Sequence, residues 1–290
     1  MADASPPTKI RLCAFIEERH NNDTYKLTNF KDFDKLKLIL NEKPTYWRLT
    51  VPTSEAAQSE ELVLSMQGVI VNKDLPPILI KPNEQHQPFI RQSVQLTGFD
   101  SKEFQTCINK LQQLHQTFSR QVPEGNMEPL TLSQFHQFDT VEFATCYFTS
   151  RRDDPNGTEM PFDQSTDPNG VLARLANNKK YFHGEDNKVL YYALKHVNDE
   201  SPPRFFDVDP AQFRVGDIVK VQITTAAVPI KNNKFKMISQ LRCLALLDGT
   251  FTDLAMSGRS KATIHLAAMK PAIKRKVGYN NTLDDEVSEA

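Results

Sequence analysis

Basic residues are concentrated toward the end of this chain. The segment from Ala211 to Lys276 holds twelve basic and three acidic residues, a net charge of +9. The whole chain of 290 residues carries only −1, so the remainder carries −10. Lysines and arginines on one strand face can follow a phosphate backbone, and an aromatic ring beside them can stack on a base. We therefore predict a nucleic-acid-binding surface made of Lys220, Lys231, Lys234, Phe235, Lys236 and Arg242.

A solvated strand face is the alternative for these lysines. Exposed lysines also prevent the edges of sheets from pairing with other chains. Good single-strand platforms interleave several aromatic residues with their cations, and this segment has few of them.

A second basic cluster stands near the C-terminus and precedes a run of acidic residues. A short cluster of this kind is typical of segments that a nuclear import receptor binds. We therefore expect a nuclear protein, with an import signal made of Lys270, Lys274, Arg275 and Lys276. An ordinary charged terminus, or an arm that contacts DNA without specificity, is the alternative. The first residues lack the basic and apolar regions of a secretory signal, which favours an intracellular protein.

One polar cluster contains side chains that could hold a metal ion. His183 and Glu185, together with the distant His265, would suit an iron site of two histidines and one carboxylate. Gly184 and Asn187 favour a turn here instead, so we predict no metal ligands.

The motifs of common enzyme classes are missing. The closest two of the 10 glycines, Gly249 and Gly258, are nine positions apart, which excludes the glycine-rich loops that cradle nucleotides. Neither a G-x-S-x-G nor an H-E-x-x-H motif occurs. We predict no catalytic residue and no cofactor, and a metal-dependent enzyme is the most distant alternative.

The first half of the chain predicts short strands bounded by Pro, Asn, Asp and Gly. We place them at 10–16, 36–40, 46–51, 62–71, 78–80 and 93–96. Glu60 and Glu61 could equally open a short helix before residue 62.

The clearest helix is predicted at 101–120. Its apolar residues recur at steps of three and four: Phe104, Cys107, Ile108, Leu111, Leu114 and Phe118. Asp100 and Glu103 resemble a capping box at its start. We expect this stripe to pack on a sheet; a partner-binding helix would leave it exposed.

The second half predicts strands at 141–149 and 188–197, two Asp-Pro-Asn-Gly turns at 154–157 and 167–170, and one or two helical turns at 171–176. The strongest pattern is a long hairpin at 213–247 that turns through asparagines at 231–234. Alternation places Phe235, Met237, Leu241 and Cys243 on one face, and Lys236, Ile238, Gln240 and Arg242 on the other.

These elements predict a mainly β fold, all-β to α+β, in two sheet-containing halves. We expect a β-rich domain at 1–125 that ends in the helix, an OB-like or other small antiparallel barrel at 126–268, and a disordered tail at 269–290. No run approaches the roughly 18 apolar residues of a membrane helix, so we expect no membrane partner.

Several segments resemble known proteins: those at 213–222, 228–231, 234–237 and 241–249, the turn at 167–170, the run at 183–187 and the tail at 274–279. They are similar to a widespread family of uncharacterised proteins from mushroom-forming fungi, which implies no known activity. The Gly-Asp-Ile-Val run at 216–219 also resembles the first strands of oligonucleotide-binding (OB) barrels. Such a barrel needs five strands, and 141–149 and 188–197 would have to supply the missing ones.

We therefore predict a nuclear protein that binds single-stranded DNA or RNA, since no recognition helix or zinc finger occurs. The alternative is a protein-interaction or scaffold module of a nuclear complex, in which sheet edges and the stripe around Leu111 contact a partner.

Overall fold

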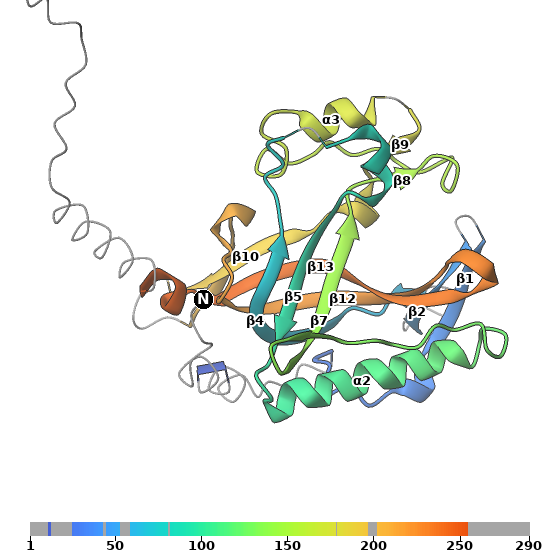
Figure 1. The fold of residues 1–290 in the computed structure, drawn as a ribbon, viewed down its shortest axis with the longest axis horizontal. Coiled ribbons are helices and arrows are strands. Elements are labelled where there is room, and N and C mark those ends of the chain that lie inside the picture. Colours follow the sequence, from blue (N-terminus) through green and yellow to red (C-terminus); the bar gives the residue numbers. More distant parts are fainter. Residues whose placement is uncertain are drawn as a thin grey trace, which may run out of the picture. The chain divides into compact units, whose positions relative to one another are not determined.

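One large β-sheet organises the structure, a computed structural model that describes residues 11–12, 25–42, 45–52, 59–80, 82–177, 179–196 and 202–254 (Figure 1). Its main path runs β11-β10-β13-β12-β4-β5-β7-β6, and β2 branches from β12 to carry β1 and β3. The fold is mainly β, as predicted. The strands are β1 (Lys37–Glu42), β2 (Thr45–Pro52), β3 (Ser59–Glu61), β4 (Leu64–Asp74), β5 (Arg91–Thr97), β6 (Ser133–Phe135), β7 (Phe138–Cys146), β10 (Leu190–Lys195), β11 (Arg204–Asp207), β12 (Ile218–Pro229) and β13 (Phe235–Asp248).

Strands from both halves of the chain share this sheet. β12 pairs with β4, and β5 pairs with β7, so the sheet crosses the predicted boundary at residue 125. All pairs are antiparallel except β10 with β13, which run parallel. The described residues form no closed barrel, and the predicted OB-like barrel is not confirmed. Their part up to Thr252 forms one compact unit.

Most strands predicted in the first half are confirmed, except those at 78–80 and 10–16. Glu60 and Glu61 belong to β3 rather than to a helix. Residues 78–80 form no strand, and the Ile78 N–H donates instead to the carbonyl of Thr166. Of the strand expected at 10–16 only Arg11 and Leu12 are described, and their backbone is helical.

The predicted helix is α2 (Lys102–Ser119), and it lies along one face of the sheet (Figure 1). Its N-cap is Ser101, whose Oγ accepts a hydrogen bond from the Phe104 N–H at 3.3 Å, so the predicted cap at Asp100 is wrong. A cap must accept from the first free N–H groups of the helix, and the serine hydroxyl is one residue closer to them. The apolar stripe is buried, Leu111 included, so α2 packs on the sheet and offers no apolar face to a partner.

The long hairpin of β12 and β13 is confirmed, with its turn at η5 (Lys231–Asn233). Asn232 and Asn233 have positive φ angles, which asparagine adopts more readily than most residues. One hairpin face enters the core through Val219, Val221, Ile223, Ala227, Met237, Leu241 and Leu244.

A smaller layer lies beyond the end of β7 and contains β8 (Thr149–Ser150), β9 (Tyr181–Phe182) and α3 (Val171–Ala176) (Figure 1). Both Asp-Pro-Asn-Gly segments form turns here, for different reasons. Gly170 has φ +63° before α3, whereas a Cβ on Gly157 would lie 2.1 Å from Cζ of Phe182. Only the second turn uses the backbone freedom of glycine; the first needs its small size.

Gly98, at the end of β5, offers a test of how tightly α2 packs on the sheet. A Cβ at this position would lie 2.1 Å from Cβ of Phe104, which is fixed to the helix backbone. We expect Gly98→Ala to lower the free energy of unfolding by about 1–3 kcal/mol through overpacking. Gly249→Ala is the control, because its nearest neighbour would be 3.5 Å away. Equal urea midpoints for the two variants would contradict this packing.

Candidate functional site

The face of the hairpin opposite the core, called here the outer face, carries most of its polar side chains. In β12 it holds Lys220, Gln222, Thr224, Ala226 and Val228, which alternate with the core residues. The register places Lys236 opposite Val228 and Gln240 opposite Thr224. The predicted alternation of β13 is therefore confirmed up to this point.

A β-bulge at Arg242 then shifts the alternation. Gln222 pairs with Cys243 while Ile223 pairs with Leu241, so β13 has one extra residue between them, Arg242. A bulge residue has no cross-strand partner, and the strand beyond it resumes with the opposite residues on each face. Cys243 therefore lies on the outer face, and its predicted place on the apolar face is wrong.

The outer face continues across the parallel pair into the neighbouring strands. Tyr192 of β10 pairs with Ala245 of β13, and Phe205 of β11 lies opposite Leu194 of β10. A pocket of about 150 Å³ opens here, and its lining residues are Tyr192, Phe205, Lys220, Gln222, Cys243 and Ala245. The Phe205 side chain is 48% exposed. An aromatic ring and a lysine are thus brought together on an open sheet face.

The structure does not gather the six predicted nucleic-acid residues into one patch. Lys220 and Lys236 lie on the outer face, and Lys231 is exposed at the turn. Lys234 Nζ is 2.7 Å from Oε1 of Glu128. Phe235 is half-buried and alternates with Lys236, so its ring does not share the face of that lysine.

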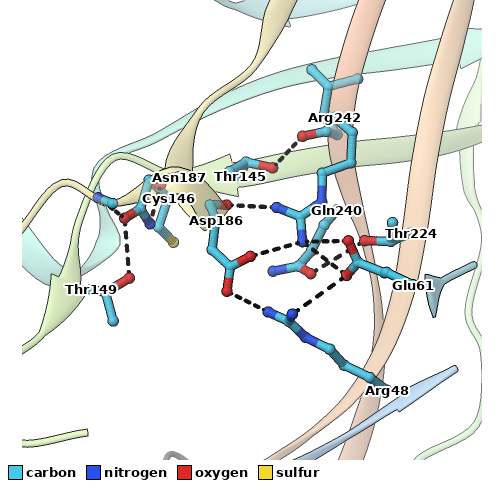
Figure 2. Close-up of polar contacts among 12 residues, drawn as sticks. Arg48, Glu61, Thr145, Cys146, Thr149, Asp186, Asn187, Thr224, Gln240 and Arg242 are labelled. Carbon is cyan, nitrogen blue, oxygen red and sulfur yellow. Dashed lines mark hydrogen bonds and ion pairs between the residues drawn. The ribbon is translucent and has the colours of Figure 1, made fainter. Parts of the chain in front are cut away.

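Arg242, the sixth predicted residue, belongs to a ring of alternating charges (Figure 2). Its Nη2 is 2.9 Å from Oε1 of Glu61 and 3.5 Å from Oδ1 of Asp186, and its Nη1 donates to the Asp186 carbonyl at 2.6 Å. Arg48 closes the ring, with Nη2 2.5 Å from Asp186 Oδ2 and Nη1 3.7 Å from Glu61 Oε1. The ring joins β2, β3, β13 and η3 (Glu185–Asn187), and its formal charge is zero.

The guanidinium groups of the ring serve the fold. The Arg242 side chain is only 13% exposed, and Nε of both arginines is buried with no hydrogen-bond partner among the described residues. Burial alone would lower the pKa of Arg48, but the charge and hydrogen bond of Asp186, with Tyr46 and Glu61, raise it above its ordinary value. Arg48 therefore stays charged, and both arginines hold the carboxylates, so neither is available to a phosphate.

Asn187 holds η3 so that Asp186 faces the arginines (Figure 2). Its Oδ1 accepts from the Gly184 N–H at 2.9 Å and from the Thr149 hydroxyl at 3.1 Å. Its Nδ2 donates to the Cys146 carbonyl at 3.0 Å. The amide thus ties η3 to the end of β7 and to β8, and Asp186 is positioned by these bonds.

The metal hypothesis finds no support in the described part of the chain. His183 is 7% exposed, stacks on Phe162 with centroids 4.1 Å apart, and has Nδ1 2.9 Å from the Tyr147 carbonyl. Glu185 begins η3 and is exposed, so the two side chains do not converge as a strand would make them. Among the described residues no cluster of His, Cys, Asp and Glu could hold a metal ion. His265 and the predicted import signal, Lys270, Lys274, Arg275 and Lys276, lie outside the described residues.

Comparisons with known proteins do not identify a family for this chain. The sequence matches no protein-family model, and no curated protein is significantly similar to it. Within the described ranges, no helix has the length and apolar character needed to cross a membrane.

Tyr192 and Phe205 were missed by the sequence analysis, as were Arg48, Glu61 and Asp186. The runs Leu-Tyr-Tyr-Ala-Leu and Arg-Phe-Phe show aromatic residues, but nothing local predicts that β10 pairs in parallel with β13. Ion pairs between positions such as 61 and 242 leave no pattern in a single sequence.

The charge ring should respond differently to the loss of Asp186 and of its neighbour Glu185. Asp186→Ala leaves Arg48 and the nearly buried Arg242 with one carboxylate between them. We expect this variant to lose about 1–3 kcal/mol of unfolding free energy, because a partly buried charge is left underpaired. Glu185→Ala removes an exposed carboxylate outside the ring, so we expect a change within about 0.5 kcal/mol. Urea unfolding measures both, and an equal loss would contradict the role of the ring.

His183 should make the fold sensitive to mild acid. Burial lowers its pKa below the ordinary value, although the hydrogen bond to the Tyr147 carbonyl opposes this. In the unfolded chain the group titrates near its usual value of about 6.5, so below that pH the unfolded state binds more protons. The free energy of unfolding therefore falls as the pH decreases through about 6.5, and levels off below the folded pKa.

The check is urea unfolding of the natural protein and of His183→Gln at about pH 7.5 and about pH 5. We expect the variant to be less stable at both values, because it loses the stacking on Phe162, but to lose less stability than the natural protein between them. If the natural protein and the variant lose the same free energy of unfolding between the two pH values, His183 does not titrate as its burial predicts.

Proposed function

We propose that this protein binds single-stranded nucleic acid on the outer face of its sheet, at the pocket between Phe205, Tyr192 and Lys220. The observation that carries the proposal is the meeting of two aromatic residues with a lysine on an open sheet face. A base can stack on an exposed ring whatever its identity, and a lysine beside it can take the phosphate.

The surroundings of the pocket support a ligand with both a flat ring and polar edges. Gln222 lines the pocket and is exposed, and an amide can hydrogen-bond to a base edge. Small residues, Cys243 and Ala245, separate the lysine from the rings and leave room between them.

The charges of this face indicate binding that depends more on stacking than on phosphates. Lys234 and Arg242 are held by carboxylates, so at most three of the five predicted cations, Lys220, Lys231 and Lys236, can add contacts to phosphates. For single strands, each phosphate contact contributes about −0.7 to the slope of log K against log salt. The slope should then be no steeper than about −2, whereas all five predicted cations would give about −3.5.

Nuclear localisation, and an import receptor that binds the basic cluster near the C-terminus, belong to the same proposal and rest on the sequence alone. A second candidate ligand is an extended segment of a partner protein, which a different surface, the cleft near the hairpin turn, favours.

Fluorescence anisotropy with labelled single-stranded DNA, single-stranded RNA and duplex DNA tests the proposal. We expect single strands to bind more tightly than duplex, with the shallow salt slope given above. Tyr192→Ala and Phe205→Ala should each weaken binding by about 1–3 kcal/mol, the usual contribution of one stacked base.

Phe89→Ala is the matched control, since Phe89 is 75% exposed but lies in η2 (Glu84–Phe89), outside the pocket. Lys220→Gln should make the salt slope shallower by about 0.7. No binding of single strands at low salt would refute the proposal. Equal losses of affinity in the Phe205 and Phe89 variants would show that the pocket is not the binding site.

A further inference from the structure

A large cleft lies at the other end of the outer face, near the hairpin turn. Its volume is about 1140 Å³, and apolar residues of the hairpin, Ala226, Val228, Pro229 and Ile238, line one side. Residues of the smaller layer, among them Phe148, Tyr181 and Phe182, line the other side. Both sides belong to the same compact unit.

The lining of the cleft is strongly acidic. Asp153, Asp154 and Glu185 line it and make no ion pair within the described residues. Arg48 is the one cationic lining residue in this part of the chain, and it is bound to Asp186 and Glu61 in the charge ring. The nearby Arg151 lies over Phe182, 4.0 Å from its centroid, and is paired with Glu159. Among the described residues, these three carboxylates therefore have no cationic partner.

The carboxylates lie beside aromatic rings because glycine allows it. A Cβ on Gly157 would be 2.1 Å from Phe182 Cζ and 2.4 Å from Asp154 Oδ2, so this carboxylate and this ring both approach the same backbone position. A Cβ on Gly184 would lie 2.9 Å from Cε2 of the same ring. Phe182 is only 3% exposed and lies under Arg151, so a cation that enters here contacts the Asp154 carboxylate and not this ring.

The size of the cleft indicates whether its ligand is a small molecule or an extended peptide segment. Pockets for drug-sized molecules measure about 300–1,000 Å³ and bury most of the ligand. This cleft is larger and open, which suits an extended segment whose side chains enter in succession. Lysine and arginine fit both of its sides, because their aliphatic stems can cover apolar surface while their charged ends reach polar groups.

We propose that this cleft binds an extended, lysine- or arginine-bearing segment of a partner protein. The cation of the segment contacts Asp153, Asp154 and Glu185, and its aliphatic stem lies on Val228 and Ile238. This site is separate from the pocket at Lys220 and has the opposite charge, so either can fail without the other. It also assigns a role to the first Asp-Pro-Asn-Gly turn, which supplies Asp154 and Gly157.

The test measures binding of a labelled, end-capped hexalysine peptide to the full chain at low salt, with hexaglutamate as the opposite-charge probe. We expect hexalysine to bind and hexaglutamate not to bind. The triple variant Asp153→Asn, Asp154→Asn, Glu185→Gln should weaken hexalysine about tenfold, the loss of three screened ion pairs. It should leave oligonucleotide binding unchanged or slightly tighter.

The control carries the same change of net charge elsewhere: Asp34→Asn, Asp74→Asn, Glu124→Gln, three exposed residues that do not line the cleft. We expect it to change the affinity less than about twofold, as surface charges do at a distance in salt. Equal weakening in the two triple variants would show mere attraction by net charge and overturn the proposal. Absence of hexalysine binding would overturn it as well, as would spermidine binding more tightly than the peptide, which would assign the cleft to a small polyamine.

Discussion

The bulge at Arg242 is the constraint on which both surfaces of the hairpin depend. Because β13 has one residue more than β12 can pair, the residues beyond the bulge change faces. Leu244 then enters the core, while Cys243 and Ala245 turn outward with their small side chains. Without the extra residue, Leu244 would lie between Tyr192 and Lys220 and fill the pocket. The bulge also releases Arg242 from cross-strand pairing, so its guanidinium can reach Glu61 and Asp186.

The charge ring divides the outer face into two regions of opposite character. Two arginines and two carboxylates neutralise each other in its middle, and Asn187 fixes the orientation of η3 from behind. On one side of the ring the lining is aromatic with a lysine, and on the other side it is aromatic with carboxylates that make no ion pair among the described residues. A polar network of this kind favours one arrangement of the strands, since both arginines lose one of their two carboxylates if η3 moves. The two surfaces therefore both depend on the charge ring between them.

Local patterns predicted the elements of this protein well, and their long-range pairing poorly. The stripe from Phe104 to Phe118 predicted α2 because a helix repeats every 3.6 residues, and the alternation of β12 predicted its buried face because a strand repeats every two. The asparagines of the turn were predicted from their tolerance of positive φ. The mainly β class follows from these local signals.

What the patterns could not predict depends on chain segments that are far apart. Clustered lysines and Arg242 indicated one cationic surface, but Glu128 holds Lys234 from 106 positions away and Glu61 holds Arg242 from 181. The parallel pairing of β10 with β13, which brings Tyr192 and Phe205 to Lys220, is equally nonlocal. The face of Cys243 was wrong because one extra residue inverts a period-two pattern, and no residue type marks that position.

The same separation of charges bears on the direction that a nucleic-acid strand would take on the outer face under the proposed function. A nucleic-acid strand that followed the hairpin from Lys220 toward Lys236 would pass Asp186, which is 56% exposed. It would then reach the cleft, whose carboxylates make no ion pair among the described residues. Each phosphate on that path would face a like charge, which costs free energy wherever water does not screen it. A nucleic-acid strand that crossed β12, β13, β10 and β11 would meet Lys220, Tyr192 and Phe205 within about 15 Å, since neighbouring β-strands are about 4.8 Å apart. The arrangement of charges therefore favours a strand that crosses the sheet, and leaves the hairpin turn and its cleft to a ligand of the opposite charge.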